Sequence, residues 1–245
     1  MRWSILLSSS LLSSLSLSSS LSSSSSLISL SLISRYNRIL KPNLSLLSSI
    51  RNMSLNLSTS LSSDEIIEIV DENNNVLEPT TRREMRQKRL IHRATYAFIR
   101  DSNNYFYVQK RSKLKDYCPS YFDPTPGGVV AAGESYELTN TREVEEEMGI
   151  SGITMNHLFT FYYEDERIKC FGDAWEGIYD GPLILQEVEV EDVEMMSMDE
   201  IITRSESGAE KFTPDSIFAC REYIKILGCP DVTGPKPQKP IFSFK

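Results

Sequence analysis

The sequence predicts an α+β protein in which a mixed β-sheet lies between helices. Short segments of alternating apolar and polar residues occur both before and after one strongly patterned central helix. A second helix with an apolar side closes this part of the chain near residue 227. Strands, a helix, more strands and a closing helix form the order expected when helices cover both faces of one sheet.

The folded part is predicted to span residues 64–227 of the 245 in the chain. Residues 1–63 are largely Ser and Leu, so no packed core is expected there. Residues 228–245 contain several prolines and are expected to form a disordered tail. The chain length suits one domain with extensions, or two small domains.

Charge is distributed unevenly along the chain. Residues 1–63 hold five of the 26 basic residues and none of the 34 acidic ones, which leaves 21 basic against 34 acidic residues, a net charge of −13, for the rest. An acidic body is a poor candidate for binding nucleic-acid polymers and suits a protein that holds divalent metals. The four cysteines show no CxxC spacing, so free thiols are expected and no zinc site is indicated.

Residues 1–63 allow three interpretations. A Ser-rich segment with arginines and no acids is typical of a mitochondrial presequence, which is the favoured interpretation. A low-complexity extension on a cytoplasmic enzyme comes second, and a secretory signal comes third because Ser interrupts the apolar run. The same interruptions argue against a membrane span, although residues 3–34 are uncharged.

The first half of the predicted domain contains three strands. Residues 64–70 alternate Ile with acids and are predicted to form an edge strand. Residues 92–100 and 105–111 alternate on either side of a turn at 101–104, which predicts a β-hairpin. The basic segment 80–90 is predicted to be a short helix or a loop, and its arginines are either solvated or face a phosphate.

Candidate substrate contacts lie at the two ends of this hairpin. Lys110 and Arg111 follow one another where the chain leaves the sheet, and Arg111 is either a bidentate phosphate donor or a surface cation. His92 is either a metal or substrate contact or a structural histidine. The aromatic and proline-rich loop 113–125 forms either one wall of a substrate pocket or a cover over the sheet.

The central helix is predicted between Ser135, a suitable N-cap, and Gly149, which suits a left-handed C-terminal position. Residues three and four apart share a helix face, so Glu143, Glu146 and Glu147 are predicted to point together away from the core. The opposite face, predicted to pack on the sheet, carries Leu138, Thr141, Val144 and Met148.

Three carboxylates on one helix face repel one another, at a cost of about 0.2–0.5 kcal/mol per pair. A bound cation would offset this repulsion. Carboxylate oxygens favour hard ions, with Mg²⁺ first and Mn²⁺ or Ca²⁺ next. The pair Gly127-Gly128 before the helix allows backbone to approach a ligand closely. The alternative is a solvated acidic face without a ligand.

Strands are predicted again after the helix, over residues 153–163 and 168–179. Residues 182–196 alternate acidic and apolar residues, which places the acids on one side of an extended chain. Glu189 in this segment is the candidate for an additional carboxylate at the metal site, and a solvent-facing edge is the alternative. The remaining predicted elements are a short helix over 197–203 and a last helix over 213–227.

The stretch 128–150 reads GVVAAGESYELTNTREVEEEMGI and resembles the signature of the Nudix hydrolases. The fixed positions of that signature are all filled, by Gly128, Glu134, Arg142, Glu143, Val144, Glu146, Glu147, Gly149 and Ile150. Four further segments are similar to a bacterial-type Nudix subgroup that itself resembles isopentenyl-diphosphate isomerase: 92–95, 109–112, 126–130 and 212–216. The resemblance implies a Nudix-type α/β/α sandwich that hydrolyses a nucleoside diphosphate linked to another moiety, X, with Mg²⁺ or Mn²⁺.

The chemistry expected from these residues is metal-assisted attack of water on a small-molecule diphosphate. The predicted metal ligands are Glu143, Glu146 and Glu147, and the general base is either Glu147 or Glu189. Arg142 is predicted to orient a glutamate through a charge-assisted hydrogen bond. The predicted substrate-binding residues are His92, Lys110, Arg111 and Gly128. No membrane partner is expected, and the oligomeric state is not predicted.

Two other functions are compatible with a diphosphate site. An isopentenyl-diphosphate isomerase moves an allylic proton, and that family carries a catalytic Cys before its helix. The matching segment 121–128, YFDPTPGG, has none, and Cys118 lies too early. A non-catalytic diphosphate-binding module is the third candidate, which the complete glutamate set disfavours. The aromatic residues that could stack a base or line a prenyl groove are Tyr117, Tyr121, Phe122, Phe161 and Tyr163.

Overall fold

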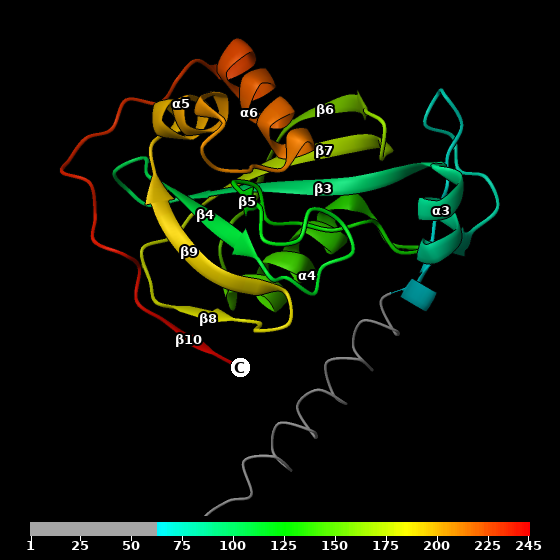
Figure 1. Cartoon of the computed structure of the whole chain (residues 1–245), viewed down its shortest axis with the longest axis horizontal. Helices are drawn as coiled ribbons and strands as arrows, with labels where there is room; N and C mark the ends of the chain where they lie inside the picture. The colour runs from blue at the N-terminus through cyan, green and yellow to red at the C-terminus, as the bar shows by residue number, and fades with distance from the viewer. Residues whose placement is uncertain (1–62) are drawn as a thin grey trace, which may run out of the picture. The chain divides into compact units, whose positions relative to one another are not determined.

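In the computed structural model of this chain, residues 63–245 are described, and a mixed six-stranded β-sheet forms their centre (Figure 1). This confirms the predicted α+β class. The strands of the sheet are β3 (Ile91–Arg100), β4 (Phe106–Arg111), β5 (Phe122–Asp123), β6 (Asn156–Glu164), β7 (Lys169–Ile178) and β9 (Val190–Met196). The helices are α3 (Arg82–Lys88), α4 (Tyr136–Met148), α5 (Met198–Ser207) and α6 (Pro214–Leu227).

The sheet opens into two halves between β3 and β4. In one half, β3 pairs in parallel with β7 along its whole length, and β7 pairs with antiparallel β6. In the other half, β4 pairs with β9 and with β5. The two halves join where the predicted hairpin turns, at the pair Arg100 and Phe106. Residues 126–130 lie along the free side of β3, and the Thr95 N–H donates to the Gly128 carbonyl at 2.9 Å.

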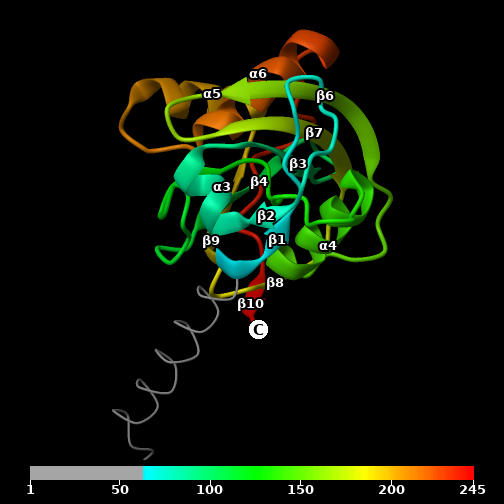
Figure 2. The same ribbon diagram turned by 90° about the vertical axis from the view of Figure 1, so that its right-hand side faces the viewer.

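Strand β3 sends alternate side chains into two cores. Tyr96 and Phe98 belong to the core under α5 and α6, whereas Ala97 and Ile99 belong to the core that Val144 and other residues of α4 cover. This period of two is that of a strand buried on both faces. Figures 1 and 2 show α4 on one face of the sheet and α5 with α6 on the other, which is the predicted sandwich.

The predicted limits of the central helix are confirmed. The Ser135 side chain accepts a hydrogen bond from the Leu138 N–H at 3.1 Å, and Gly149 has a φ of 70°. The basic segment 80–90 forms the short helix α3 rather than a loop. Thr81 is its N-cap, and Met85 is its buried contact with the rest of the fold.

Two predictions about strands are corrected. Residues 64–70 hold the two-residue strand β1 (Ile66–Ile67), which pairs with β2 (Thr80–Thr81), and they meet the main sheet through an isolated bridge between Ile69 and His92 of β3, so they do not form one continuous edge strand. The segment 182–196 is broken into β8 (Leu183–Leu185) and β9 by a turn at 187–189. The alternation of a strand does not hold within this turn. The spacing of the glutamates at 187 and 189 therefore does not predict which way their side chains point.

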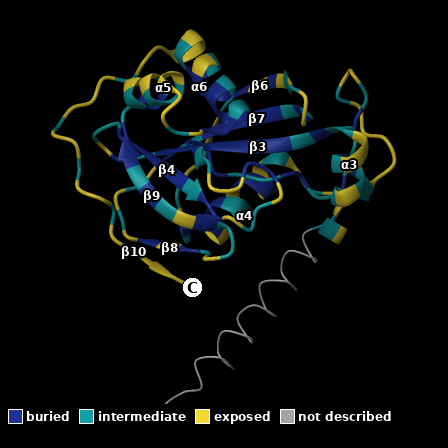
Figure 3. Cartoon of the chain, viewed as in Figure 1, coloured by how far each residue is buried: buried dark blue, intermediate teal, exposed yellow. Residues whose placement is uncertain are grey.

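The proline-rich tail was predicted to be disordered, and the structure corrects this prediction. Its end forms β10 (Phe242–Phe244), which pairs in parallel with β8. Before that, the Tyr105 hydroxyl donates to the Gly234 carbonyl at 3.1 Å and the Asn104 side chain donates to the Asp231 carbonyl at 2.7 Å. Prolines exclude a helix but allow an extended chain, and this one runs over the surface, mostly exposed (Figure 3).

The predictions about the N-terminal segment lie outside the described residues, apart from residue 63. Within residues 63–245, no helix combines the length and the apolar character needed to cross a lipid bilayer.

Candidate active site

A cleft lies where the two halves of the sheet separate. The start of β3, the glycine segment 126–130, helix α3, the loop after β4 and the start of α6 all contribute to its walls. Its charged lining residues are Arg82, Arg86, Arg111, Lys115, Asp123 and Asp215. Four basic residues against two acidic ones suit an anionic ligand.

The three glutamates of α4 have different environments. Glu147 is buried, with 1% of its surface exposed, whereas the Glu146 side chain is 50% exposed and the Glu143 side chain 16%. Among residues 63–245, no three His, Cys, Asp or Glu side chains gather closely enough to hold a metal ion. The prediction that all three point away from the core is therefore wrong for Glu147, and their role as metal ligands stays a prediction.

Helix α4 is rotated relative to the predicted orientation. Val144 and Met148 pack in the core as predicted, but Leu138 and Thr141 are exposed. Glu147 turns inward because Gln109 on β4 donates a hydrogen bond from Nε2 to its Oε2 at 3.0 Å, which gives the buried carboxylate a partner. The residues of α4 that are buried are Thr139, Asn140, Val144, Glu147 and Met148.

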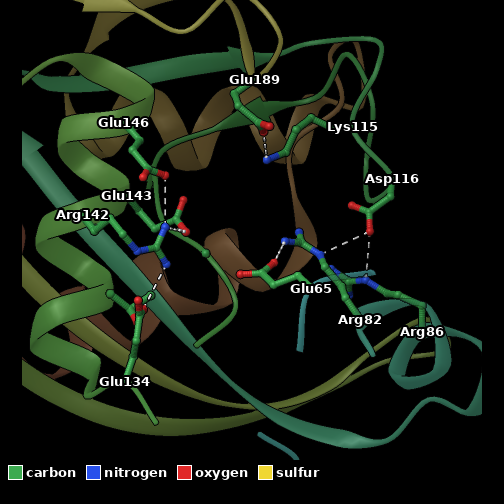
Figure 4. A network of polar contacts seen from close by, with 12 residues as sticks. Glu65, Arg82, Arg86, Lys115, Asp116, Glu134, Arg142, Glu143, Glu146 and Glu189 are labelled. Atoms are coloured by element: carbon green, nitrogen blue, oxygen red, sulfur yellow. Dashed lines mark hydrogen bonds and ion pairs between the residues drawn. The ribbon is translucent and has the colours of Figure 1, made fainter. Parts of the chain in front are cut away.

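Lys115 connects Glu147 to Glu189. Its Nζ lies 3.4 Å from Glu147 Oε1 and also donates to Glu189 Oε2. Figure 4 shows Lys115 pointing toward Glu189. Glu189 belongs to the turn before β9 and not to an extended strand. The additional carboxylate sought from the sequence is therefore close to Glu147, although the alternation that suggested it does not place it there.

Burial shapes the charges of this group. It raises the pKa of Glu143 to about 7, and the neighbouring Glu147 carboxylate adds to the increase. Burial also raises the pKa of Glu147, against the opposing effect of Lys115. Burial acts on Glu189 in the same direction, but Lys115 outweighs it and the pKa of Glu189 is lowered. The two helix carboxylates are therefore incompletely compensated, and a bound cation would stabilise their charged forms.

Arg142 holds Glu143 and Glu146 in place, which confirms the predicted charge-assisted contact. One of its nitrogens, Nη1, lies 3.0 Å from an oxygen of each, and Nη2 lies 3.1 Å from Glu134 (Figure 4). Gly128 makes room for the Glu143 carboxylate, because a Cβ at Gly128 would come within 2.4 Å of Glu143 Oε1. The close approach predicted at this glycine is thus made by a side chain of the protein.

Two of the predicted substrate contacts are corrected. Arg111 lines the cleft, but its guanidinium is committed to Asp123 at 2.9 Å and to the Tyr117 carbonyl at 3.2 Å, so it does not offer a free fork to a phosphate. Lys110 lies 3.7 Å from Glu191 and does not line the cleft. Alternation along β4 explains the difference, since neighbouring residues point to opposite faces of a sheet.

His92 is a buried wall of the cleft. Its Nδ1 lies 3.2 Å from the Leu90 carbonyl oxygen, and 2% of the residue is exposed. Burial, with the Arg86 charge nearby, lowers the pKa of His92 to about 3, so the ring is neutral at physiological pH. This environment favours the structural alternative.

The sequence reasoning missed Gln109 and Lys115. Gln109 could have been found, because strand alternation places its side chain on the same face as Arg111. Lys115 carries no such signal, since it lies in a loop whose path the sequence does not define. Arg82 and Arg86 were noted only as part of a basic segment. Their spacing of four residues puts both on one face once the segment is helical.

The residues present fit one hard divalent cation at Glu143 and Glu147. Both are buried oxygen donors whose charge is incompletely balanced. Within the described part of the chain, Gln109 Oε1 beside them is buried and has no hydrogen-bond partner. Mg²⁺ in proteins commonly takes one or two carboxylates and completes its shell with water and substrate phosphates. A carboxylate pair next to a cationic cleft matches that requirement.

Comparison with known proteins agrees with this geometry. A model of the NUDIX domain matches residues 90–216. An uncharacterized Nudix hydrolase of Yersinia pestis is 41% identical over 160 residues, covering 65% of this chain and 86% of that protein. The uncharacterized Nudix hydrolase YfcD of Escherichia coli K12 is 38% identical over 165 residues, covering 67% and 89%.

The fold has a counterpart among solved structures. The crystal structure of DR0079 from Deinococcus radiodurans superposes with a TM-score of 0.58 at 24% identity, covering 64% of this chain and 98% of that one. This likeness supports the fold, while the family follows from the matched domain and the two bacterial relatives. The chain belongs to the Nudix family of diphosphate hydrolases.

Proposed function

We propose that the protein uses Mg²⁺ to hydrolyse a small molecule in which a nucleoside diphosphate is linked to another moiety, X. The observation that carries this proposal is the position of the carboxylate pair. Glu143 and Glu147, whose negative charge is incompletely balanced, lie beside a cleft with an excess of cations. A diphosphate with its metal ion supplies both the missing positive charge and the anion that the cleft suits.

The two arginines of α3 that line the cleft, Arg82 and Arg86, suit phosphate oxygens. Arg82 lies 3.2 Å from Glu65 and 3.6 Å from Asp116, and Arg86 lies 3.5 Å from Asp116 (Figure 4). In the described part of the chain, Nε of both arginines reaches Asp116 only at ion-pair distance, and Nη1 of Arg86 is buried without a hydrogen-bond partner. Buried, unused donors on a charged group are costly unless a ligand satisfies them. The phosphate-facing alternative for the basic segment is therefore favoured.

The proposed roles of the carboxylates follow from their partners. Glu143 and Glu147 would hold Mg²⁺, which would neutralise phosphate oxygens and make a water molecule a stronger nucleophile. Arg142 fixes Glu143 and Gln109 fixes Glu147, so both carboxylates are held in position. The general base is Glu147 or Glu189, and the lowered pKa of Glu189 keeps it ionised and able to accept a proton.

The cysteines do not support the isomerase alternative. Within residues 63–245, no cysteine lines the cleft. Cys118, in the loop after β4, is buried and lies 3.3 Å from Arg167. Cys170 and Cys220 belong to the core under α5 and α6. An allylic proton shuttle based on a cysteine therefore has no thiol in position.

The identity of X is constrained by the aromatic residues. Of the five proposed to stack a base or line a prenyl groove, Tyr117 lines the cleft, and Arg86 lies over its ring at 5.1 Å. Phe161 and Tyr163 pack against Phe218, and Phe122 packs against Phe212. Stacking of a base on the face of Tyr117 that Arg86 covers would therefore require Arg86 to move.

Hydrolysis with a panel of diphosphates tests the proposal. The purified protein is incubated with each compound and Mg²⁺, and release of phosphate or monophosphate is measured with and without chelator. We expect chelator to abolish release and Glu147→Gln to slow it by about 10²–10⁴-fold. Glu145→Gln, an exposed position on the same helix, is the matched control and should stay within about twofold. Conversion of isopentenyl to dimethylallyl diphosphate without phosphate release would refute hydrolysis.

A further inference from the structure

We propose that Lys115 is an exchangeable internal counter-ion that couples metal binding to diphosphate binding. In the metal-free protein its ammonium is shared between Glu147 and Glu189. When a divalent cation binds at the α4 carboxylates, Lys115 releases Glu147 and contacts the anionic substrate in the cleft. This inference rests on the proposed function and adds a positioning residue to it.

The first step is the contact itself. Lys115 Nζ touches Glu147 Oε1 at 3.4 Å and donates to Glu189 Oε2, so one ammonium serves two carboxylates. The Lys115 side chain is 11% exposed and the Glu147 side chain 2%, so water screens this group poorly. A poorly screened ammonium and a divalent cation on the same carboxylate repel each other, which favours release of the ammonium when the divalent cation binds.

The second step is where the ammonium goes. Lys115 also lines the cleft, as do Arg82 and Arg86 of α3, and in the described part of the chain Nη1 of Arg86 is a buried donor without a hydrogen-bond partner. A lysine carries a point charge on a flexible stem and can exchange partners without the geometric demands of a guanidinium fork. Arg142, by contrast, contacts Glu134, Glu143 and Glu146 together and is held in place. Lys115 is therefore the cation of this group that is free to change partners.

The third step distinguishes exchange from a static salt bridge. If Lys115 kept its contact with Glu147 when both ligands bind, its removal would leave the coupling between metal binding and diphosphate binding unchanged. If it exchanges, its removal has opposite effects on the two ligands. The metal ion no longer competes with an ammonium and binds more tightly, whereas the diphosphate loses a cation and binds more weakly.

Two binding measurements test whether the affinities for the metal ion and for the diphosphate change in opposite directions. Mn²⁺ is titrated into the metal-free full-length chain and free Mn²⁺ is followed by electron paramagnetic resonance. We expect Lys115→Met to bind Mn²⁺ about tenfold more tightly than the wild type. Imidodiphosphate, which resists hydrolysis, is then titrated at saturating Mn²⁺, and we expect Lys115→Met to bind it about tenfold more weakly. Lys113→Met removes an exposed charge from the same loop and should change neither value by more than about twofold.

The outcomes separate this inference from the proposed function. Failure of the wild type to bind Mn²⁺ would refute the metal-dependent function. Normal Mn²⁺ binding by the wild type, with unchanged or weaker binding by Lys115→Met, would refute the counter-ion role alone.

If Lys115→Met does not fold by circular dichroism, Lys115→Gln replaces it. In the wild type, imidodiphosphate should tighten Mn²⁺ binding, and loss of part of this coupling in Lys115→Gln supports exchange, whereas full coupling overturns it.

Discussion

Two groups of buried carboxylates have different surroundings: Asp123 and Asp215 line the cleft, whereas Glu143 and Glu147 lie behind the lining residues Gly128 and Lys115. Asp123, Asp215 and the residues that hydrogen-bond to them form what we call the floor group of the cleft. Asp123 accepts hydrogen bonds from Arg111 at 2.9 Å, from Ser216 at 2.7 Å and from the Thr125 N–H at 3.1 Å. Asp215 beside it accepts from two tyrosine hydroxyls. Each of these carboxylates has fixed partners on neighbouring elements, so this group joins β4, β5 and α6.

The glutamates of α4 lack such complete partners. Glu143 shares Arg142 with two other acids, and Glu147 shares Lys115 with Glu189. Burial raises the pKa of each, and it raises the pKa of Asp215 as well, so the two groups differ in their partners and not in the direction of this shift. A buried charge with complete partners stabilises a fold, whereas one without them is poised for a ligand. The comparison predicts that the floor group governs the stability of the fold. The helix group, Glu143 and Glu147, is predicted to govern binding of the metal ion.

The largest expected effect is on stability, from Arg111→Met. The substitution leaves the Asp123 carboxylate buried and without its cation, which costs about 3–5 kcal/mol. Urea denaturation measures the loss of the free energy of unfolding. Lys110→Met, one residue earlier with its side chain toward Glu191, is the matched control and should cost less than about 1 kcal/mol. Equal costs for the two variants would contradict the structural role of the floor group.

An intermediate effect of opposite sign is expected from Glu143→Gln. The pKa of Glu143 in the folded protein is about 7, above the ordinary value of 4.5. Between these pH values the folded protein retains a proton that the unfolded chain releases. The free energy of unfolding of the metal-free wild type therefore falls as pH rises through this window, by roughly 1–3 kcal/mol.

Glu143→Gln removes this dependence on pH. The variant should be more stable than the wild type above pH 7 and equally stable below pH 4.5, while it loses affinity for Mn²⁺. Urea denaturation of both proteins from pH 4 to 8, without metal, provides the measurement. Lower stability of the variant at pH 8 would show that the ion pair with Arg142 outweighs the cost of burying the charge.

The two groups also differ in how far the sequence predicts them. The limits of α4 depend on local signals, the Ser135 side chain and the left-handed Gly149, and both were found from sequence alone. The inward side of α4 includes Glu147, whose buried carboxylate has its hydrogen-bond partner in Gln109, 38 residues away along the chain. No periodicity within the helix encodes that partner.

Distance along the chain limits the prediction of the floor group even more. Asp123 and Ser216 are 93 residues apart, and nothing near either residue indicates the contact. Strand alternation in β3 and the order of elements were enough for the fold, because each depends on neighbouring residues. The partners of buried charges come from different elements, so the sequence shows which residues carry charge but not which of them are compensated.

The smallest expected effect, from Ser216→Ala, tests whether the two groups are independent. The Ser216 hydroxyl donates to Asp123 Oδ1, but that oxygen also accepts from the Thr125 N–H, so the carboxylate keeps a partner. We expect a loss of about 1 kcal/mol in the free energy of unfolding, measured by urea denaturation. Mn²⁺ affinity should not change, because the hydroxyl acts on the floor group alone. A fall in Mn²⁺ affinity comparable to that of Glu143→Gln would mean that the two groups act as one, since the floor would then govern binding as well as stability.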